Sequence, residues 1–407
     1  MTDSTTSSLA SSLESVGETR AIIDLDAYAH NIGVLRASAP EGAAFMAVVK
    51  ADAYGHGLVE CGRTAQSIGC EWLGVARIVE ALRLRDADVD IPILVLGPPV
   101  STELTAAIQR GVTLAAGSWS MVERIREAAK AAGATARVHI KVDVGMRRYG
   151  FLPEEISAAV QRLKAMPEIE IDGVFSHFSS ADEPGAEPTG AQIALFSAAV
   201  AEVREAGIEP RWVHLANSAG IITGRVGPTN MVRSGAATYG LSPSPEVPCD
   251  ERFQPVMSVR SVVARVSQAP LDCGVSYNCI YRTTADEMLA TIPIGYADGL
   301  PRPLANQGWF VIGGQRRPIR GRVCMDQTIV GDADDVSEGD EVIIVGSNAN
   351  GAMSFEDIGP MAATNNYEVA TRLMARVPRI YIRNGEPVAV EHLLHDAAVR
   401  SVETARA

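Results

Sequence analysis

The fold is decided by the stretch Ala47-Val48-Val49-Lys50-Ala51-Asp52-Ala53-Tyr54-Gly55-His56-Gly57. An apolar, β-rich run ends on Lys50, and a turn punctuated by glycine then leads into a helical pattern. A lysine at the C-terminal end of a buried strand is partly removed from water, which lowers its pKa and makes the amine nucleophilic. The alternative is a strand-end lysine that simply reaches solvent, and these residues alone do not decide between the two.

Strand-like runs alternate with amphipathic helical segments around this stretch. After a first run at 20–25, eight strand candidates follow at 44–49, 72–76, 91–96, 112–116, 136–144, 171–178, 212–216 and 230–233. Helical patterns cover 27–37, 119–132, 154–165 and 190–206. This alternation predicts an α/β fold built on a (β/α)8, TIM-like barrel. A doubly wound open sheet alternates in the same way, but the absence of a Gly-x-Gly-x-x-Gly motif after the first strand disfavours it.

The pattern changes after the proline-rich segment 242–248. Residues 254–266 alternate with period two, further short strands are expected at 288–294, 309–312, 317–323 and 340–345, and one helix is expected near 364–375. This predicts a second, mostly antiparallel β domain. We therefore expect a disordered tail at 1–18, the barrel at 19–250, the β domain at 251–390 and a C-terminal helix or tail at 391–407. The first strand, 20–25, could pack with the β domain instead of the barrel.

Composition narrows the class of protein. The chain has 407 residues, 47% of them hydrophobic, which is enough for two domains with their own cores. A net charge of −13 argues against nucleic acid or an anionic membrane as a partner. No apolar run is long enough to span a membrane, and the Ser/Thr-rich start does not read as a signal peptide. The six cysteines are scattered without ligand spacing, which is typical of free thiols in a cytoplasmic protein and predicts no metal site.

Chemistry in a (β/α)8 barrel belongs at the C-terminal ends of the strands. Those ends carry Lys50, Lys141, His177, Asn217-Ser218 and Arg233. Each has a purely structural alternative: a core position for the histidine, an ion pair for the arginine and a helix cap for the Asn-Ser pair. A helix start at Asn217-Ser218 could also hold an anion on its N–H groups. Because all of these residues converge on one rim, the sequence predicts an active site there.

These motifs resemble those of the alanine racemase family, which are pyridoxal 5′-phosphate (PLP) enzymes with a barrel and a β domain. The resemblance covers residues 20–382, and its motifs stand in the family's order. Besides the lysine stretch, they are Gly274-Val275-Ser276-Tyr277, Pro293-Ile294-Gly295-Tyr296-Ala297-Asp298-Gly299, Cys324-Met325-Asp326-Gln327 and Asn366-Tyr367-Glu368.

The resemblance implies a role for each matching residue. Lys50 would carry the cofactor and act as the base on one face of the substrate's Cα, and Tyr277 of the partner subunit would be the base on the other face. The cofactor-binding set would be Lys50, Tyr54, His177, Asn217, Ser218, Arg233, Gly235, Ala236 and Tyr367. Arg148 and Met325 would bind the substrate, and Lys141 is a candidate for conversion to a carbamate. Because a guanidinium only donates, Arg233 would leave the ring nitrogen of PLP unprotonated, which suits racemisation.

The resemblance therefore implies a cytoplasmic racemase that interconverts L- and D-alanine for the cell wall, as a homodimer with shared active sites. The alternatives are a racemase of another amino acid such as serine, a PLP-dependent amino-acid decarboxylase, and a non-catalytic PLP carrier. Tyr277 disfavours the decarboxylase, which has no use for a second base, and the long β domain disfavours the carrier.

The sequence also departs from the family's pattern. Asn278 follows the catalytic tyrosine where the family usually has glycine, and Val144 replaces the threonine of Asp-Thr-Gly-Met. Ser234, Ala236 and Thr238 change the segment that commonly reads Pro-Gly-Ile-Ala-Leu-Tyr-Gly. These changes lie near the expected phosphate and tyrosine positions, so serine or another amino acid stays open as the substrate.

Overall fold

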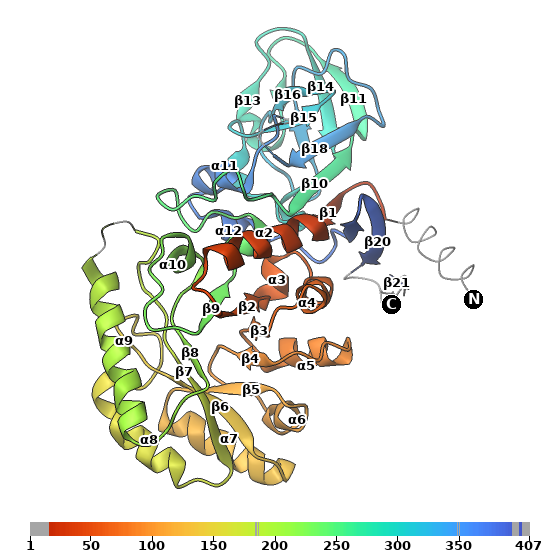
Figure 1. Ribbon diagram of the computed structural model, residues 1–407. Helices are drawn as coiled ribbons and strands as arrows, with labels where there is room; N and C mark the ends of the chain where they lie inside the picture. The colour runs from red at the N-terminus through yellow and green to blue at the C-terminus, as the bar shows by residue number, and fades with distance from the viewer. Residues whose placement is uncertain are drawn as a thin grey trace. The chain divides into compact units, whose positions relative to one another are not determined.

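The computed structural model describes residues 16–183, 185, 187–347, 349, 351–392 and 399–400. The chain divides into two compact units, and the labels of Figure 1 identify their elements. One unit contains Ala29–Tyr54 and Leu58–Phe253, and the other contains Gly55–Gly57, Gln254–Ala407 and the segment that ends at Tyr28. Most of the tail predicted at 1–18 lies outside the described residues.

The first unit is built on an eight-stranded parallel sheet with the order β8-β7-β6-β5-β4-β3-β2-β9. Its strands are β2 (Ala44–Val48), β3 (Trp72–Val75), β4 (Ile93–Val95), β5 (Thr113–Ala116), β6 (Ala136–Lys141), β7 (Ile169–Phe175), β8 (Trp212–His214) and β9 (Met231–Ser234). Hydrogen bonds also join the two ends of this order, from Asn230 N–H to Val213 C=O at 3.0 Å and from Arg233 N–H to Ala216 C=O at 3.1 Å. The sheet is therefore closed, and the predicted TIM-like barrel is confirmed.

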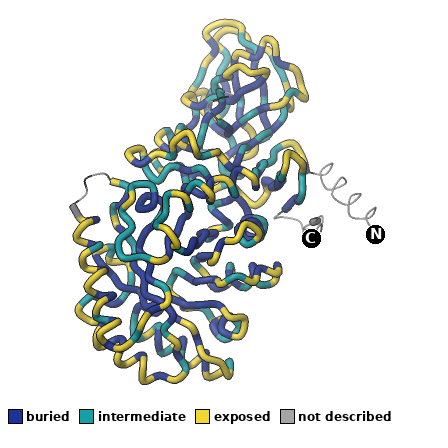
Figure 2. The backbone as a smooth tube through the Cα atoms, viewed as in Figure 1, coloured by how far each residue is buried: buried dark blue, intermediate teal, exposed yellow. Residues whose placement is uncertain are grey.

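Helices alternate with these strands along the chain. They are α2 (Leu25–Ser38), α3 (Lys50–Tyr54), α4 (Leu58–Ser67), α5 (Ile78–Asp86), α6 (Leu104–Gln109), α7 (Trp119–Ala132), α8 (Ile156–Lys164), α9 (Glu187–Glu205) and α10 (Ser218–Ile222). In α7, Ser118 caps the N-terminus by accepting from the Met121 N–H, and Gly133 ends the helix with a φ of 63°. Figure 2 shows that such helices expose their outer faces, whereas the barrel strands are mostly buried.

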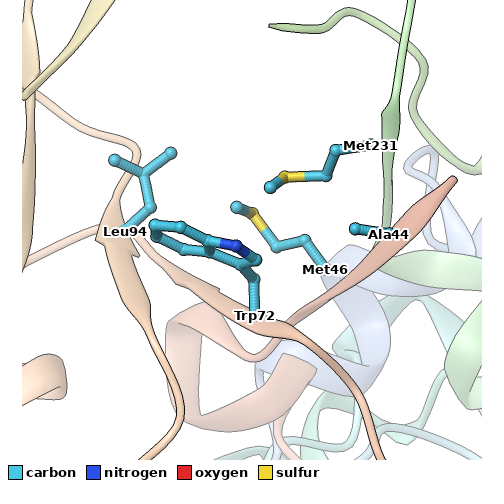
Figure 3. Packing of buried hydrophobic residues seen from close by; sticks show 5 residues of the cluster. All are labelled: Ala44, Met46, Trp72, Leu94 and Met231. Atoms are coloured by element: carbon cyan, nitrogen blue, oxygen red, sulfur yellow. The ribbon is translucent and has the colours of Figure 1, made fainter. Parts of the chain in front are cut away.

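An apolar cluster fills the barrel interior between the N-terminal halves of its strands. Figure 3 shows its members, which are Ala44, Met46, Trp72, Leu94 and Met231. Strands of a parallel barrel are covered on both faces, so they read as continuous apolar runs. The polar residues of the sequence motifs are left to the opposite, C-terminal ends of the strands.

The second unit is mostly antiparallel, as predicted. Its large sheet has the order β16-β15-β18-β10-β1-β19-β20-β21, with a three-stranded sheet β11-β14-β17 and a pair β12-β13. Strand β1 lies in this large sheet, antiparallel to β10 and parallel to β19. The strands are β1 (Arg20–Asp24), β10 (Met257–Val262), β11 (Arg265–Ala269), β12 (Gly274–Val275), β13 (Tyr281–Arg282), β14 (Glu287–Ile292), β15 (Trp309–Ile312), β16 (Gln315–Pro318), β17 (Thr328–Val330), β18 (Glu341–Val345), β19 (Arg379–Arg383), β20 (Glu386–Glu391) and β21 (Val399–Arg400).

The observed secondary structure of this unit differs from three local predictions. The single strand expected at 254–266 is two strands, because Val263 N–H bonds to Asp340 while Ala264 N–H bonds to Thr291, so the chain changes sheet between them. The helix expected near 364–375 is the shorter α12 (Asn366–Thr371), and it is preceded by α11 (Phe355–Met361). Within the segment 391–407, Val399–Arg400 is a strand, and most of the rest lies outside the described residues.

Candidate active site

Lys50 lies two residues after the end of β2, at the C-terminal end of the barrel strands. Its side chain is partly buried, and its Nζ lies 5.9 Å from the centre of the Tyr54 ring. Burial lowers the pKa of the amine, the charge of Arg148 lowers it further, and Glu80 opposes the shift. A larger fraction of this lysine is therefore a free, nucleophilic amine than would be the case in water.

The residues after Lys50 form a left-handed turn. Ala51, Asp52 and Ala53 have φ near +50° and ψ near +50°, with φ/ψ of 53/51°, 55/46° and 52/49°, and Tyr54 has a φ of 56°. L-residues in this region cost roughly 1–2 kcal/mol each. Two carboxylates hold the turn: Ala51 N–H donates to Glu80 Oε1 at 2.6 Å, and Leu58 N–H donates to Asp52 Oδ1 at 2.9 Å.

Arg233 is buried in a set of neutral acceptors. Its Nη1 lies 2.9 Å from His214 Nδ1, and its Nη2 donates to the carbonyls of Ser176 at 2.9 Å and Leu215 at 3.0 Å. The same Nη2 lies 3.2 Å from His177 Nδ1. Burial lowers the pKa of the guanidinium to about 10, which still leaves it charged at neutral pH. Burial and the neighbouring cations hold the pKa of His177 well below its usual value, so its imidazole is neutral.

Ser218 and Gly235 form a small polar cradle at the ends of β8 and β9. The Ser218 hydroxyl accepts from Gly235 N–H at 3.1 Å and from Ala237 N–H at 3.4 Å, and it bonds to Ser234 Oγ at 2.9 Å. Asn217 has the capping role, since its Oδ1 accepts from Gly220 N–H at 2.9 Å. The two neighbouring residues thus have different structural roles: Asn217 caps α10, whereas Ser218 bonds to residues at the end of β9.

Tyr54 closes one side of this cradle. A Cβ atom on Gly235 would lie 2.4 Å from the Tyr54 hydroxyl oxygen, so only glycine leaves room for that hydroxyl. The Tyr54 ring packs against Tyr239 with their centres 5.1 Å apart, and Tyr239 in turn donates to Val48 C=O at 2.9 Å. Hydroxyl groups and backbone N–H groups are therefore gathered at one point of the rim.

Lys141 and Arg148 lie on the same rim. Lys141 is buried, and its Nζ donates to Val142 C=O at 2.6 Å. Burial lowers the pKa of Lys141 to about 7; Asp143 opposes the shift, and the charges of Arg233 and Arg148 contribute to it. The Asp143 carboxylate orders the loop toward Arg148 by accepting from Gly145 N–H and Arg147 N–H at 2.9 and 3.0 Å.

The remaining predicted residues belong to the other unit. Tyr277 is 68% exposed in a short 3-10 segment, and Met325 is 52% exposed on a neighbouring loop. The two loops are connected, because Ser276 Oγ donates to Arg322 C=O at 2.8 Å and lies 3.4 Å from Cys324 Sγ. Tyr367 lies on α12 and is partly buried.

Comparison with known proteins matches both units. Residues 23–243 fit the model of the alanine racemase N-terminal domain, and residues 256–381 fit that of its C-terminal domain. Alanine racemase of Thermobifida fusca is 42% identical over 88% of this chain and 96% of its own length. The chain belongs to the alanine racemase family.

Solved structures agree with this membership of the alanine racemase family. The alanine racemase of a D-cycloserine-producing Streptomyces lavendulae superposes with a TM-score of 0.86 at 38% identity, covering 93% of this chain and 99% of that one. The alanine racemase of Bartonella henselae, solved with covalently bound pyridoxal phosphate, gives a TM-score of 0.79 at 28% identity over 90% of this chain and 100% of that one. These relatives are isomerases, and so is this member of the family.

The departures from the alanine racemase pattern have local structural reasons. Asn278 has a φ of +64°, a conformation that glycine adopts freely and that asparagine tolerates better than most residues. Val144 is buried at 3% exposure, so its methyl groups are covered. Ser234 is fully buried and its hydroxyl has a partner in Ser218.

The φ of Asn278 gives a testable expectation for this family member. We expect Asn278→Gly to fold as well as the natural chain, whereas Asn278→Val should lower the thermal unfolding midpoint, because a β-branched residue is strained at a positive φ. The cost should be about 1–3 kcal/mol in free energy of unfolding. Differential scanning calorimetry measures both variants, and equal midpoints for valine and glycine would contradict this explanation.

Three residues that support the candidate site, Glu80, His139 and His214, were not predicted from the sequence. Glu80 holds the left-handed turn and also accepts from the N–H groups of Ala76 and Arg77 at 2.8 and 2.9 Å. His214 and His139 lie behind Arg233, with His139 Nδ1 2.8 Å from His214 Nε2. A signal for the histidines was present, since His139 is two residues before Lys141 on one strand and therefore faces the same side.

Among the residues that the structure describes, no helix is long and apolar enough to cross a membrane. Within the same residues, no group of three or more His, Cys, Asp or Glu side chains could hold a metal ion. None of the six cysteines, which all lie in the described part of the chain, forms a disulfide bond.

Proposed function

We propose that this protein is a PLP-dependent alanine racemase in which Lys50 and Tyr277 of the partner subunit act as bases on opposite faces of the substrate's Cα. The observation that carries the proposal is the partly buried amine of Lys50 on the same barrel rim as Arg233 and the Ser218–Gly235 cradle. PLP, when bound, draws electron density away from the Cα–H bond of an amino acid.

The residues present fit this cofactor. A phosphate group needs N–H and O–H donors, and the rim supplies the Ser218 and Tyr54 hydroxyls with the N–H groups of Gly235 and Ala236. The absence of a Cβ at Gly235 is what lets Tyr54 reach this cradle. A pyridine nitrogen needs a partner, and Arg233 can only donate to it. On the family resemblance, Tyr367 is assigned to the phosphate, and His177 is assigned to bridge Arg233 and Tyr277 of the partner subunit.

The side chains of the site then have distinct roles. Lys50 holds the cofactor and exchanges a proton with one face of Cα, and Tyr277 of the partner subunit does so on the other face. Arg233 keeps the ring nitrogen unprotonated, which limits how long negative charge persists at Cα. Arg148 binds the substrate carboxylate, with the backbone of Met325 of the partner subunit assisting. A small substrate such as alanine fits this set, and serine remains the alternative.

The exposed surface of the second unit supports a homodimer with shared sites. Tyr277, Ile280, Tyr296 and Met325 are 68, 41, 40 and 52% exposed. Their loops are tied together by hydrogen bonds from Tyr296 N–H to Cys324 C=O and from Ala297 N–H to Met325 C=O, both at 2.9 Å. Aromatic and methionine side chains grouped in this way are typical of an interface. The cytoplasmic location and the supply of D-alanine for the cell wall belong to this proposal on the family alone.

The function is tested by incubating the purified protein and PLP with each L-amino acid in turn, followed by separation of enantiomers. We expect a yellow protein that converts L-alanine to a mixture of both enantiomers and forms no amine product. Borohydride should fix the cofactor to the peptide that contains Lys50.

A matched control shows whether the loss of activity and labelling is specific to Lys50 or follows from replacing any lysine. Lys130 is partly exposed and pairs with Glu127 at 2.9 Å, so Lys130→Ala should keep full activity and full labelling, whereas Lys50→Ala should lose both. Labelling of another lysine in the natural protein, or release of an amine and CO₂ as the main reaction, would overturn the proposal.

Carbamylation of Lys141 is a separate part of the proposal. A carbamate forms when a neutral amine attacks CO₂ and loses a proton, and a pKa of about 7 makes Lys141 mostly neutral above that pH. In ¹³C-labelled bicarbonate, a protein-bound carbamate signal should therefore grow as the pH rises through about 7, and it should be absent from Lys141→Met. A signal that is equal in the variant would assign the carbamate to another amine.

A further inference from the structure

Behind Arg233, a line of buried polar side chains runs through the barrel. Arg233 Nη1 lies 2.9 Å from His214 Nδ1, and His214 Nε2 lies 2.8 Å from His139 Nδ1. His139 Nε2 in turn faces Asp172 Oδ2 at 3.6 Å. The relative exposures of the two histidines are 0%, and those of Arg233 and Asp172 are 3% and 9%. His139, His214 and Asp172 are not among the proposed cofactor-binding residues.

The direction of hydrogen bonding along this line is fixed by the groups at its two ends. A guanidinium can only donate, so His214 Nδ1 must be an acceptor and its proton must lie on Nε2. His139 Nδ1 then has to accept from His214, which puts the proton of His139 on Nε2 as well. His139 Nε2 lies 3.6 Å from a carboxylate oxygen of Asp172, and an ionised carboxylate only accepts. Both imidazoles are neutral, because burial lowers the pKa of each.

Local structure places Asp172 for this contact. Val138 pairs with Ile171 but His139 pairs with Gly173, so Asp172 is an extra residue in β7 at a β-bulge. A bulge redirects the side chain of its extra residue, and bulges are frequent next to active sites. Gly173 makes the space, since a Cβ there would lie 2.9 Å from ring atoms of His139.

The surroundings of the line are apolar. His139 packs beside Trp72 with ring centres 5.3 Å apart, and Trp72 belongs to the cluster shown in Figure 3. His214 stacks on Phe175 at 5.0 Å with an angle of 8° between the rings. His139 Nε2 is buried and makes no hydrogen bond within the described part of the chain. The nearby carboxylate of Asp172 is therefore the group that can favour a proton on this nitrogen.

We propose that Asp172 and His139 are positioning residues that fix the tautomer of His214 and thereby hold the Arg233 guanidinium in place for the cofactor's ring nitrogen. If the proton of His214 moved to Nδ1, it would face an N–H of Arg233, and the arginine would have to turn away. The tautomers follow from the structure alone, whereas the effect on the cofactor rests on the proposed function.

The test uses the full-length protein loaded with PLP and labelled with ¹⁵N-histidine. Solid-state ¹⁵N NMR, with signals assigned by single substitutions, should show both His139 and His214 protonated on Nε2 only. Asp172→Leu removes the acceptor at nearly constant size and should populate the other tautomer of either histidine. Asp172→Asn keeps an acceptor oxygen and should restore the original tautomers. Glu170→Gln, an exposed carboxylate on the same strand, is the matched control and should change nothing.

The second readout is the ratio of pyruvate to D-alanine formed from L-alanine. Without the Arg233 donor in place, PLP would be the stronger electron sink, and loss of the amino group from alanine to the cofactor would compete better with racemisation. Each pyruvate formed would leave one cofactor in its amine form, so the ratio is measured with PLP in excess. Asp172→Leu should raise this ratio about tenfold, which corresponds to about 1.4 kcal/mol, while Asp172→Asn and Glu170→Gln should stay near the natural value.

The outcomes separate the two proposals. An unchanged tautomer pattern in Asp172→Leu, or equal effects of leucine and asparagine, would overturn the positioning role. Absence of racemisation in the natural protein would overturn the proposed function, while the NMR result would still decide the tautomers. Gly173→Ala, which pushes on the His139 ring, should reproduce the leucine effect if the Asp172 variant fails to fold.

Discussion

Refolding an equal mixture of Lys50→Ala and Tyr277→Phe proteins should restore about a quarter of the natural racemase activity, although each variant alone is nearly inactive. Random pairing makes about half of the dimers mixed, and in a twofold dimer each contact occurs twice. In a mixed dimer one site carries both lesions and the other carries neither. Half of the dimers therefore have one working site of two.

This expectation is based on the two residues belonging to different units of the chain. Lys50 belongs to the barrel unit, and Tyr277 is an exposed side chain of the β unit. A matched control mixes Lys50→Ala with Arg148→Ala, whose residues both belong to the barrel unit, so every site keeps a lesion and no activity should return. Failure of the first mixture, with mixed dimers demonstrated by mass spectrometry, would mean that one chain supplies both bases.

Tyr277→Phe alone should slow proton abstraction from L-alanine by roughly 10²–10⁴-fold, the usual contribution of a general base. With D-alanine in heavy water, Lys50 should still exchange the Cα proton, and the product should stay mostly D. Exchange is followed by ¹H NMR and inversion by chiral chromatography.

The control for this experiment is Tyr296→Phe, a second exposed tyrosine of the same unit. It should affect both enantiomers to a similar and smaller extent. If Tyr277→Phe reduced exchange equally for L- and D-alanine, the two bases would not have separate faces.

Much of the barrel could be predicted because its strands are covered on both sides and read as unbroken apolar runs, such as 44–49 ahead of Lys50. The β unit was less predictable. The alternation at 254–266 is the same in either sheet, and only the partners of Val263 and Ala264 show where the chain changes sheet. Helix α11 was missed because Gly359 and Pro360 lie near its end and usually mark a turn.

The candidate site was predictable where the place of a residue at a strand end is enough to put it on the rim, as for Lys50 and Arg233. It was not predictable where the role depends on a neighbour from another strand. Nothing in the sequence indicates that Glu80 accepts from Ala51, or that a bulge turns Asp172 toward His139. The family resemblance supplied the roles of Tyr277 and Met325, which no pattern of spacing would have given.

The left-handed turn at Ala51–Tyr54 has a stereochemical consequence. For a residue of opposite chirality, this region of backbone conformation is the ordinary right-handed helix seen in a mirror. Ala51 is exposed, so a D-alanine introduced there by chemical ligation would meet little steric resistance. It should stabilise the folded chain by roughly 1–2 kcal/mol, seen as a higher urea midpoint. In this chain, the segment that follows Lys50 has the backbone conformation that the D enantiomer of its own alanines would prefer.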